Sequence, residues 1–431
     1  MTSLRYQHAP SLLAVVPALL MACSDGPGYA TDHILTTPSG GSIFGGSRLH
    51  TDDDGADIEP PRLWLAWADE DGEPLTAVLG PPEGDVDKML LLDDGRVVAA
   101  WAVAETQTVQ LATFSSKGAL IHHDELSFAD LSTVPEGFDV TTLVLRPGGL
   151  LVGVSSREGD ASSTRLAAID GLDGVRTVRF AVRLDGDALA TSTNGGTLAL
   201  TESTDDAGAP VVIRGLELDD EGAAVRAFRL ETTRSALVLD TALSTTDDEV
   251  LLSVSEGWSG DEEPRTANVL RLDADRLIRW QRAIADNGLT TAFGTDAEGV
   301  AFLALSVPPT GASLEKGDIG LIAFDDAGEV AYQWVVGAES NPEGMSVIDS
   351  QVFVTGYEYE RGNARWQFSE SGASGCEGEV RAGSFDVEEG SVTATAEVEL
   401  PAVAELSASL HARANVFETV DVSADDVAIC R

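Results

Sequence analysis

The feature of this sequence that most constrains its fold is a unit of short strands and tight turns that recurs seven times. Its clearest copy, residues 319–336, holds an apolar strand, a tight Asp-Asp-Ala-Gly turn and a second strand rich in aromatic and apolar residues. Relatives of this stretch occur between Arg62 and Leu400. The units have four strands each and repeat about every 50 residues, as the blades of β-propellers do. The sequence therefore predicts an all-β chain folded as a seven-bladed β-propeller of four-stranded antiparallel blades.

Two turns mark each unit, and both favour residues that adopt a positive φ. The turn between the first and second strands (A and B) is expected at residues 40–41, 94–95, 148–149, 195–196, 248–249, 298–299 and 350–351. The turn between the third and fourth strands (C and D) is expected at residues 69–72, 115–118, 170–174, 219–222, 273–276, 325–328 and 386–390. An Asp that opens such a turn accepts hydrogen bonds from backbone amides two residues on. Strand D then carries a large aromatic residue, which we expect to pack between adjacent blades: Phe180, Phe228, Trp280 and Trp334.

The beginning of the chain has the features of an export signal. Residues 1–10 carry Arg5 and no acidic residue, and a short apolar run, residues 11–20, follows. This run is too short to be a permanent membrane-spanning helix, and no other run approaches about 18 apolar residues. The Leu-Met-Ala-Cys sequence at residues 20–23 resembles the lipobox of bacterial lipoproteins.

That resemblance implies that Cys23 is lipidated and becomes the new N-terminus. It divides the chain into a lipoprotein signal peptide (1–22), a tether (23–31), the propeller (32–400) and a closing segment (401–431). The protein would then be lipid-anchored in the bacterial cell envelope, in the periplasm or on the outer-membrane surface. The alternative is an ordinary secretory signal cleaved near Ala22, which leaves Cys23 as a stray thiol.

The closing segment alternates apolar and polar residues at 406–413, which is the period of a strand. We expect it to add strands beside the last blade and to help close the ring. Cys376 and Cys430 are the two cysteines left over in an exported chain, which favours one disulfide between them. On the chain-entropy estimate, a closed loop of that length contributes about 4 kcal/mol.

The repeat itself resembles the bacterial seven-bladed β-propeller repeat of exported and surface proteins. The similarity is tightest at residues 287–357 and spreads diffusely over about residues 32–400. The units are also distantly similar to those of quinoprotein-like propellers, in which a Gly is followed four residues later by Trp. Here that spacing survives as Arg276 and Trp280, with Arg in the place of Gly. This departure indicates a shared architecture without quinone chemistry.

The composition argues against one class of partner. The chain has 72 acidic and 27 basic residues, and its formal net charge is −45. Such a surface repels nucleic-acid phosphates and anionic lipid head groups, so we exclude a nucleic-acid partner. The acidity is either a solvated surface for a salty environment or a surface that attracts cations or a cationic partner.

The motifs of common catalytic and metal sites are absent from the sequence. It contains no His-Glu-x-x-His, Cys-x-x-Cys, dinucleotide fingerprint or P-loop. We therefore predict no catalytic residues, no metal site and no cofactor. The acidic residues 52–59 resemble a calcium loop in composition, but fail its twelve-residue pattern at His50 and Pro61. His122 and His123 are expected to be solvated at a strand edge.

The connections between strands B and C vary most in length, and such loops gather on one face of a propeller. Trp258 and Trp366 are expected within these loops, where they either pack locally or contact a partner. The favoured function is a non-enzymatic binding or scaffold module with an envelope protein or polysaccharide partner. The alternative is a propeller-family hydrolase or lyase with carboxylates at the central channel, and fold alone does not separate the two.

Overall fold

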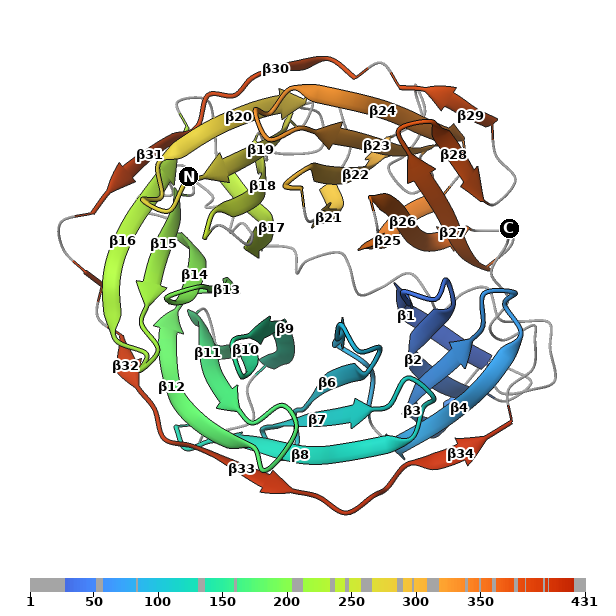
Figure 1. The fold of residues 1–431 in the computed structure, drawn as a ribbon. Coiled ribbons are helices and arrows are strands. Elements are labelled where there is room, and N and C mark those ends of the chain that lie inside the picture. Colours follow the sequence, from blue (N-terminus) through green and yellow to red (C-terminus); the bar gives the residue numbers. More distant parts are fainter. Residues whose placement is uncertain are drawn as a thin grey trace, which may run out of the picture.

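The computed structural model shows seven antiparallel sheets arranged in a ring, in chain order (Figure 1). It describes residues 28–51, 57–82, 84–130, 136–158, 161–203, 212–232, 237–244, 248–256, 266–284, 290–296, 298–307, 318–337, 340–348, 350–358, 362–375, 379–383, 385–397, 400–401 and 403–421. The expected seven-bladed β-propeller is therefore confirmed. Each blade begins with four consecutive strands, the first next to the axis and the fourth on the outer wall.

The strands of the first four blades are β1 (Gly28–Thr36), β2 (Ser42–Thr51), β3 (Asp57–Ala68), β4 (Pro74–Pro82), β5 (Lys88–Leu91), β6 (Val97–Val103), β7 (Thr108–Phe114), β8 (Leu120–Phe128), β9 (Glu136–Arg146), β10 (Gly149–Glu158), β11 (Ala161–Asp170), β12 (Thr177–Asp185), β13 (Ala188–Thr193), β14 (Gly196–Ser203), β15 (Val212–Leu218) and β16 (Ala224–Glu231). Those of blades five to seven are β17 (Leu237–Ser244), β18 (Val250–Glu256), β19 (Thr266–Leu272), β20 (Ile278–Ile284), β21 (Thr290–Thr295), β22 (Ala301–Val307), β23 (Asp318–Phe324), β24 (Val330–Gly337), β25 (Ser340–Ile348), β26 (Gln351–Glu358), β27 (Gly362–Ser369) and β28 (Gly372–Gly375).

The turns form largely where the sequence predicts them, and for the predicted reason. Gly40 and Gly95 have φ values of 86° and 82°, and the non-glycine residues Asp248 and Ser350 adopt 63° and 60° at the equivalent turns. At the second kind of turn, the Asp325 carboxylate accepts hydrogen bonds from the amides of residues 327 and 329 at 2.9 and 2.8 Å. The same pair of bonds recurs at three other turns, at Asp69, Asp219 and Asp273.

The hydrophobic core lies mainly between neighbouring sheets, as the apolar B and C strands predict. Phe180, Phe228, Trp280 and Trp334 each join a cluster formed with the following blade, so their expected place between blades is confirmed. Trp280 lies directly on the next blade's turn: a Cβ added at Gly328 would come 2.5 Å from its ring, and its indole N–H donates to the Asp326 carbonyl at 3.1 Å. A glycine at residue 328 therefore serves both the turn and the neighbouring blade.

The C-terminal part of the chain forms a belt around the outside of the ring. After β28 the chain turns back and adds a fifth strand to blades six, five, four, three, two and one in that order (Figure 1). The belt strands are β29 (Glu379–Ala382), β30 (Val387–Glu389), β31 (Thr393–Ala396), β32 (Ala404–Glu405), β33 (Ala408–Ala412) and β34 (Glu418–Val420). All six pair antiparallel with the outer strand of their blade.

Belt side chains also enter the core. Val392 is 2% exposed in the cluster between blades four and five. Leu406 and Leu410 pack on the cluster between blades two and three. The Phe417 ring meets those of Trp101 and Phe114 edge-on, with centroids 6.1 and 5.0 Å apart. The belt is thus part of the folded core.

This arrangement corrects two expectations. Residues 386–390 were expected to form the second turn of unit seven, but they lie in and beside belt strand β30 on blade five. The turn of blade seven lies instead between β27 and β28, at residues 370–371. The closing segment was expected beside the last blade, but its strands β32, β33 and β34 pair with blades three, two and one.

Arginines join neighbouring blades at the end of the ring that carries the A–B and C–D turns. Arg146 of blade three pairs with Asp220 of blade four at 2.7 Å, and Arg271 of blade five with Asp326 of blade six at 2.8 Å. Both guanidinium groups are almost fully buried. Charge-assisted hydrogen bonds of this kind fix geometry strongly because their partners are ionised. They hold adjacent turns in a fixed relation.

Blades seven and one meet without sharing a sheet. Arg365 of β27 donates to the Gly40 carbonyl at 2.7 Å, and the Thr355 hydroxyl donates to the Ile34 carbonyl at 3.2 Å. Every other pair of neighbouring blades is also linked by the chain that leads from one blade into the next. The seam between blades seven and one therefore depends, in the described residues, on side-chain contacts.

Candidate functional site: the mouth of the central channel

Ionisable side chains gather where the chain enters the innermost strands of blades one, two and three. We call this group the mouth cluster; its members are Asp32, His33, Asp85, Asp87, Lys88 and Asp139. They come from β1, from β5 and the connection leading into it, and from β9; β5 contacts both β1 and β9. This is the end of the ring opposite the arginine-bridged turns, and it is the face on which the variable loops emerge.

Asp32 lies at an irregularity of the innermost strand. The register between β1 and β2 shifts at this residue, and comparable shifts occur in β9, β17, β21 and β25. Such bulges change the direction of the side chain they carry, and they occur often beside functional sites. A bulge here places a carboxylic acid on a strand that is otherwise rich in apolar residues.

The Asp32 side chain lies beside that of Asp85 and lowers the pKa of Asp85. Burial raises the pKa of Asp85, opposed by hydrogen bonds from the Val86 amide at 2.8 Å and from the Ser47 hydroxyl. The Asp85 side chain nevertheless keeps contact with solvent, so water tempers the effect of burial.

Asp87 links blades two and three. Its Oδ2 accepts hydrogen bonds from the Ala102 amide at 2.8 Å and from the Val140 amide at 3.1 Å. Burial raises its pKa to about 7, because the two amides offset only part of the cost and the charges of Asp139 and Asp85 raise it further. Glu202 accepts an amide hydrogen bond from Leu239 in a similar way between blades four and five, so this contact has a structural role as well.

His33, Lys88 and Asp139 complete the cluster. Burial lowers the pKa of His33 to about 4, helped by the positive charge of Lys88. The neutral imidazole donates from Nε2 to the Val86 carbonyl at 3.0 Å, since a carbonyl can only accept. Burial also lowers the pKa of Lys88, which the Asp87 charge counteracts, and raises that of Asp139. The cluster thus holds four carboxyl groups with one cationic side chain among them.

We expect Asp87→Asn to stabilise the protein above pH 7 and to change little near pH 4. The folded-state pKa of Asp87 is about 7 against an ordinary 3.8, so the folded state keeps a proton that the unfolded state loses between these values. The stability contributed by neutral Asp87 is therefore lost as the pH rises through about 7. Asn keeps an acceptor oxygen for both amides and carries no charge.

Thermal unfolding of Asp87→Asn and wild type from pH 4 to pH 8 measures the effect. The gain should grow up to pH 7, reach about 1–3 kcal/mol and then level off. Asp275→Asn, in an exposed turn, is the control and should give a small gain that does not grow in this range. A gain in Asp87→Asn that is the same at pH 4 and pH 8 would contradict the raised pKa.

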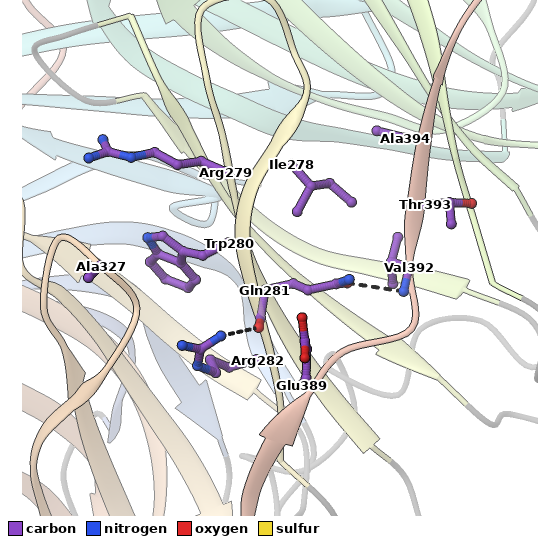
Figure 2. A pocket seen from close by; sticks show the side chains of 10 residues that line it. All are labelled: Ile278, Arg279, Trp280, Gln281, Arg282, Ala327, Glu389, Val392, Thr393 and Ala394. Carbon is purple, nitrogen blue, oxygen red and sulfur yellow. Dashed lines mark hydrogen bonds between the residues drawn. The ribbon is translucent and has the colours of Figure 1, made fainter.

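A crevice lies on the outer wall of the described structure (Figure 2). It has a volume of about 560 Å³ and lies between β20, the turn at Ala327 and the belt link from Glu389 to Ala394. Its polar groups already bind one another: the Gln281 side chain accepts from the Val392 amide at 3.1 Å, and Arg282 pairs with Glu329 at 2.7 Å. We therefore interpret this crevice as part of the contact between the belt and the outer strand β20.

Of the site residues that the sequence suggested, the structure describes Trp366 and leaves the others outside the described residues. Trp366 was expected in a loop, but it lies in β27. It is 1% exposed in the core between blades six and seven, so of its two expected roles it fills that of packing. Cys23, Trp258, Cys376, Cys430 and the acidic residues 52–56 lie outside the described residues. Their roles stay predictions.

His123 also differs from expectation. It is 7% exposed, stacks on Trp101 with ring centroids 5.9 Å apart, and hydrogen-bonds the belt carbonyl of Ala414 at 3.1 Å. In the described part of the chain, no three His, Cys, Asp or Glu side chains come together as metal ligands. Nor does a helix long and apolar enough to cross a bilayer occur there.

Sequence reasoning missed the mouth cluster because its residues come from three blades. Two local signals were present. The stretch from Gly84 to Lys88 places two Asp and a Lys where the chain passes from blade one to blade two, and Asp32–His33 interrupts an apolar inner strand. Neither stretch shows its neighbours until blades one, two and three are packed side by side.

Comparisons with known proteins add little to this geometry. No family model matches the sequence, and no curated protein matches it. A solved structure of a protein of unknown function from Bacteroides caccae aligns at 12% identity and a TM-score of 0.36. The alignment covers 63% of this chain and 89% of that one. The seven-bladed ring described above is therefore the basis for assigning its architecture.

Proposed function

We propose that this protein is an exported, lipid-anchored β-propeller of the bacterial cell envelope that binds a cationic segment of an envelope protein at its channel mouth. The observation that carries the proposal is the mouth cluster, in which four Asp side chains from three blades converge on the loop face. The net charge of −45 adds a long-range attraction for positive partners. The lipobox-like sequence ending at Cys23 supports the anchor, and the similarity to exported bacterial propeller repeats supports the location.

The chemistry of the cluster fits a cationic group. Burial raises the pKa of Asp85, and Asp87, with a pKa of about 7, keeps part of its proton near neutral pH. An ammonium or guanidinium group placed among them would displace these protons, because a nearby positive charge favours the ionised carboxylate. Binding should therefore release protons and weaken as the pH falls. It should also weaken with salt, since screening shortens electrostatic attraction to about 8–10 Å.

Two measurements on the full-length protein test this proposal, one of the lipid anchor and one of the binding. Protein recovered from the membrane fraction should carry acyl chains on Cys23, and Cys23→Ala should leave that fraction. A hexalysine peptide, titrated calorimetrically, should bind wild type at least tenfold more tightly than Asp32→Asn/Asp85→Asn/Asp139→Asn. The control, Asp71→Asn/Asp93→Asn/Asp275→Asn, removes the same charge from turns elsewhere on the ring. Equal binding by the two triple variants would mean that the peptide responds to net charge and that the mouth cluster is not its binding site. An unacylated Cys23 in the membrane fraction would contradict the lipid anchor.

A second function is favoured by one specific observation. Asp87, with a pKa of about 7, can serve as an acid or a base near neutral pH, and the carboxyl groups of Asp85 and Asp139 lie near it. This is the arrangement expected of a propeller-family hydrolase or lyase with carboxylates at the channel. Turnover of a substrate that disappears in Asp85→Asn, with a bell-shaped pH profile in wild type, would replace the binding function with this one.

A further inference from the structure

Lys88 is the cationic side chain of the mouth cluster, and neither function proposed above requires it. The chain has three lysines, at residues 88, 117 and 316. Lys88 begins β5, the strand of blade two next to the axis, whereas Lys117 is exposed in the second turn of the same blade. Lys316 lies outside the described residues. Two lysines of one blade are therefore held in different surroundings.

A bulge places Lys88 at the mouth of the channel. Lys88 pairs with Ala100 of β6, and the amide of Asp87 donates to the carbonyl of the same alanine at 3.1 Å. Two residues thus face one, which is the arrangement of a β-bulge. In β1 the bulge lies at Asp32, so His33 and Lys88 hold equivalent places, each directly after a bulge. Because β5 contacts β1 and β9, the Lys88 amine lies among ionisable groups of neighbouring blades.

The positive charge of Lys88 is poorly compensated. Met89 and Leu90, which follow it, pack into the apolar clusters on the two sides of the blade, so Lys88 lies at the edge of the core. Among the described residues, no hydrogen bond or ion pair holds its ammonium group. The buried guanidinium of Arg146, by contrast, pairs with Asp220. The Lys88 side chain is half-buried and keeps contact with solvent, so a small molecule can reach it.

These surroundings favour the neutral amine. Burial lowers the pKa of Lys88, and the charge of Asp87 counteracts this effect. The titratable groups of the cluster come from three elements: Asp32 and His33 from β1, Asp85 and Asp87 from the connection, and Asp139 from β9. Burial keeps His33 neutral and raises the pKa of Asp85 and of Asp139, so these acids offer Lys88 less opposite charge than exposed carboxylates would. A desolvated, neutral lysine amine is a nucleophile towards carbonyl groups.

We propose that Lys88 is a carbonyl-binding residue that forms a Schiff base with a small uncharged aldehyde at the channel mouth. The neutral Nζ attacks the carbonyl carbon, and a proton passes from the nitrogen to the oxygen to give a carbinolamine. The hydroxyl then leaves with the second nitrogen proton as water, and the C=N bond forms. One amine and one aldehyde thus give one imine and one water, without an oxidant or a reductant. The inference does not depend on the binding of a cationic segment.

The charge of the site selects among carbonyl compounds. Four carboxyl groups belong to the mouth cluster, and the whole chain has a formal net charge of −45. This field repels aldehydes and ketones that carry a carboxylate or a phosphate. An uncharged aldehyde, such as the open form of an aldose, meets no such repulsion.

Reductive alkylation of the full-length protein tests the site. Propanal is added at pH 7 with cyanoborohydride, which reduces each imine to a stable secondary amine, and peptide mapping gives the rate at each lysine. We expect Lys88 to react about tenfold faster than Lys117 in the folded protein, because burial increases the neutral fraction of its amine, and equally fast in urea. With glyoxylate, an aldehyde that carries a carboxylate, the preference for Lys88 should disappear. Equal rates with propanal in the folded protein, or a preference retained with glyoxylate, would overturn the inference.

Three variants separate a reactive amine from an accessible one. Lys88→Arg keeps the charge but cannot form the imine, so labelling at residue 88 should vanish while the Tm stays near that of wild type. Lys117→Arg is the matched control and should leave the rate at Lys88 unchanged. Asp87→Asn removes the charge that holds the Lys88 pKa up, so the rate at Lys88 should rise at pH 8 and change little at pH 6. An unchanged rate at pH 8 in Asp87→Asn would contradict the inference.

The outcome for Lys88 is independent of the outcome for the cationic partner. Loss of hexalysine binding with labelling of Lys88 intact would refute the proposed function and leave this inference standing. Hexalysine binding by a protein whose Lys88 reacts no faster than Lys117 would do the opposite.

Discussion

Truncation after residue 378, which removes the whole belt, is expected to abolish cooperative folding. The outer strands of six blades would lose their backbone partners, and core clusters would lose Val392, Leu406, Leu410 and Phe417. Newly exposed strand edges would then promote association between molecules. Circular dichroism and calorimetry should show no sharp unfolding transition, and the protein should aggregate.

A graded series makes this prediction specific. Truncation after residue 421 retains every described belt strand and should fold cooperatively. Truncation after residue 402 removes β32, β33 and β34 and should selectively speed amide exchange in β12, β8 and β4. If the protein truncated after residue 378 melts as sharply as the full chain, the belt is a surface addition and contributes little to the core.

Arg276→Gly is expected to destabilise the protein by about 2–3 kcal/mol, although it removes backbone strain. Arg276 has a φ of 63°, a conformation that favours glycine by about 1 kcal/mol. Its buried guanidinium, however, pairs with Glu217 at 2.5 Å and donates to the Asp248 carbonyl at 2.5 Å. Breaking a buried pair costs about 3–5 kcal/mol because its partner is left in a poorly solvated place. Arg226 still contacts Glu217 and offsets part of this loss.

The matched control is Gln107→Gly. Gln107 has a similar φ of 55°, so this substitution should be neutral or stabilising by up to about 0.5 kcal/mol. Denaturant unfolding of both variants measures the difference. A stabilised Arg276→Gly would mean that the ion pair contributes less than the strain that it imposes. The expected outcome also explains why Arg276 stands where the equivalent turns of other blades have Gly72, Gly222 and Gly328.

The fold could be predicted from the sequence wherever the signal is local. The A–B turns were found even where Asp248 and Ser350 replace glycine, because spacing and strand pattern agree. The pairing of strands that lie far apart in the sequence could not be predicted. The pattern at residues 386–390 is that of a second turn, yet these residues pair with blade five, because alternation shows which face is buried and says nothing of the partner strand.

The candidate site shows the same limit more sharply. Trp366 looked like a loop residue because the preceding connection is polar, but β27 begins at Gly362 and carries it into the core. Asp32 and Asp85 are 53 residues apart, and the folding of blade one and the start of blade two brings their side chains together. Charge and composition gave the acidity of the protein, whereas the place where it is concentrated depends on the tertiary structure.

The belt also limits how this protein can change during evolution. Propeller genes gain or lose blades readily when a repeat is duplicated or deleted, because each blade contacts its neighbours in the same way. Here an eighth blade would widen the perimeter, and the belt would need a matching insertion of four to eleven residues at the right point to stay in register with every outer strand. A duplication in one part of the gene would need a coordinated change in another. The belt therefore restricts the propeller to seven blades, because the spacing of its strands matches a ring of that size.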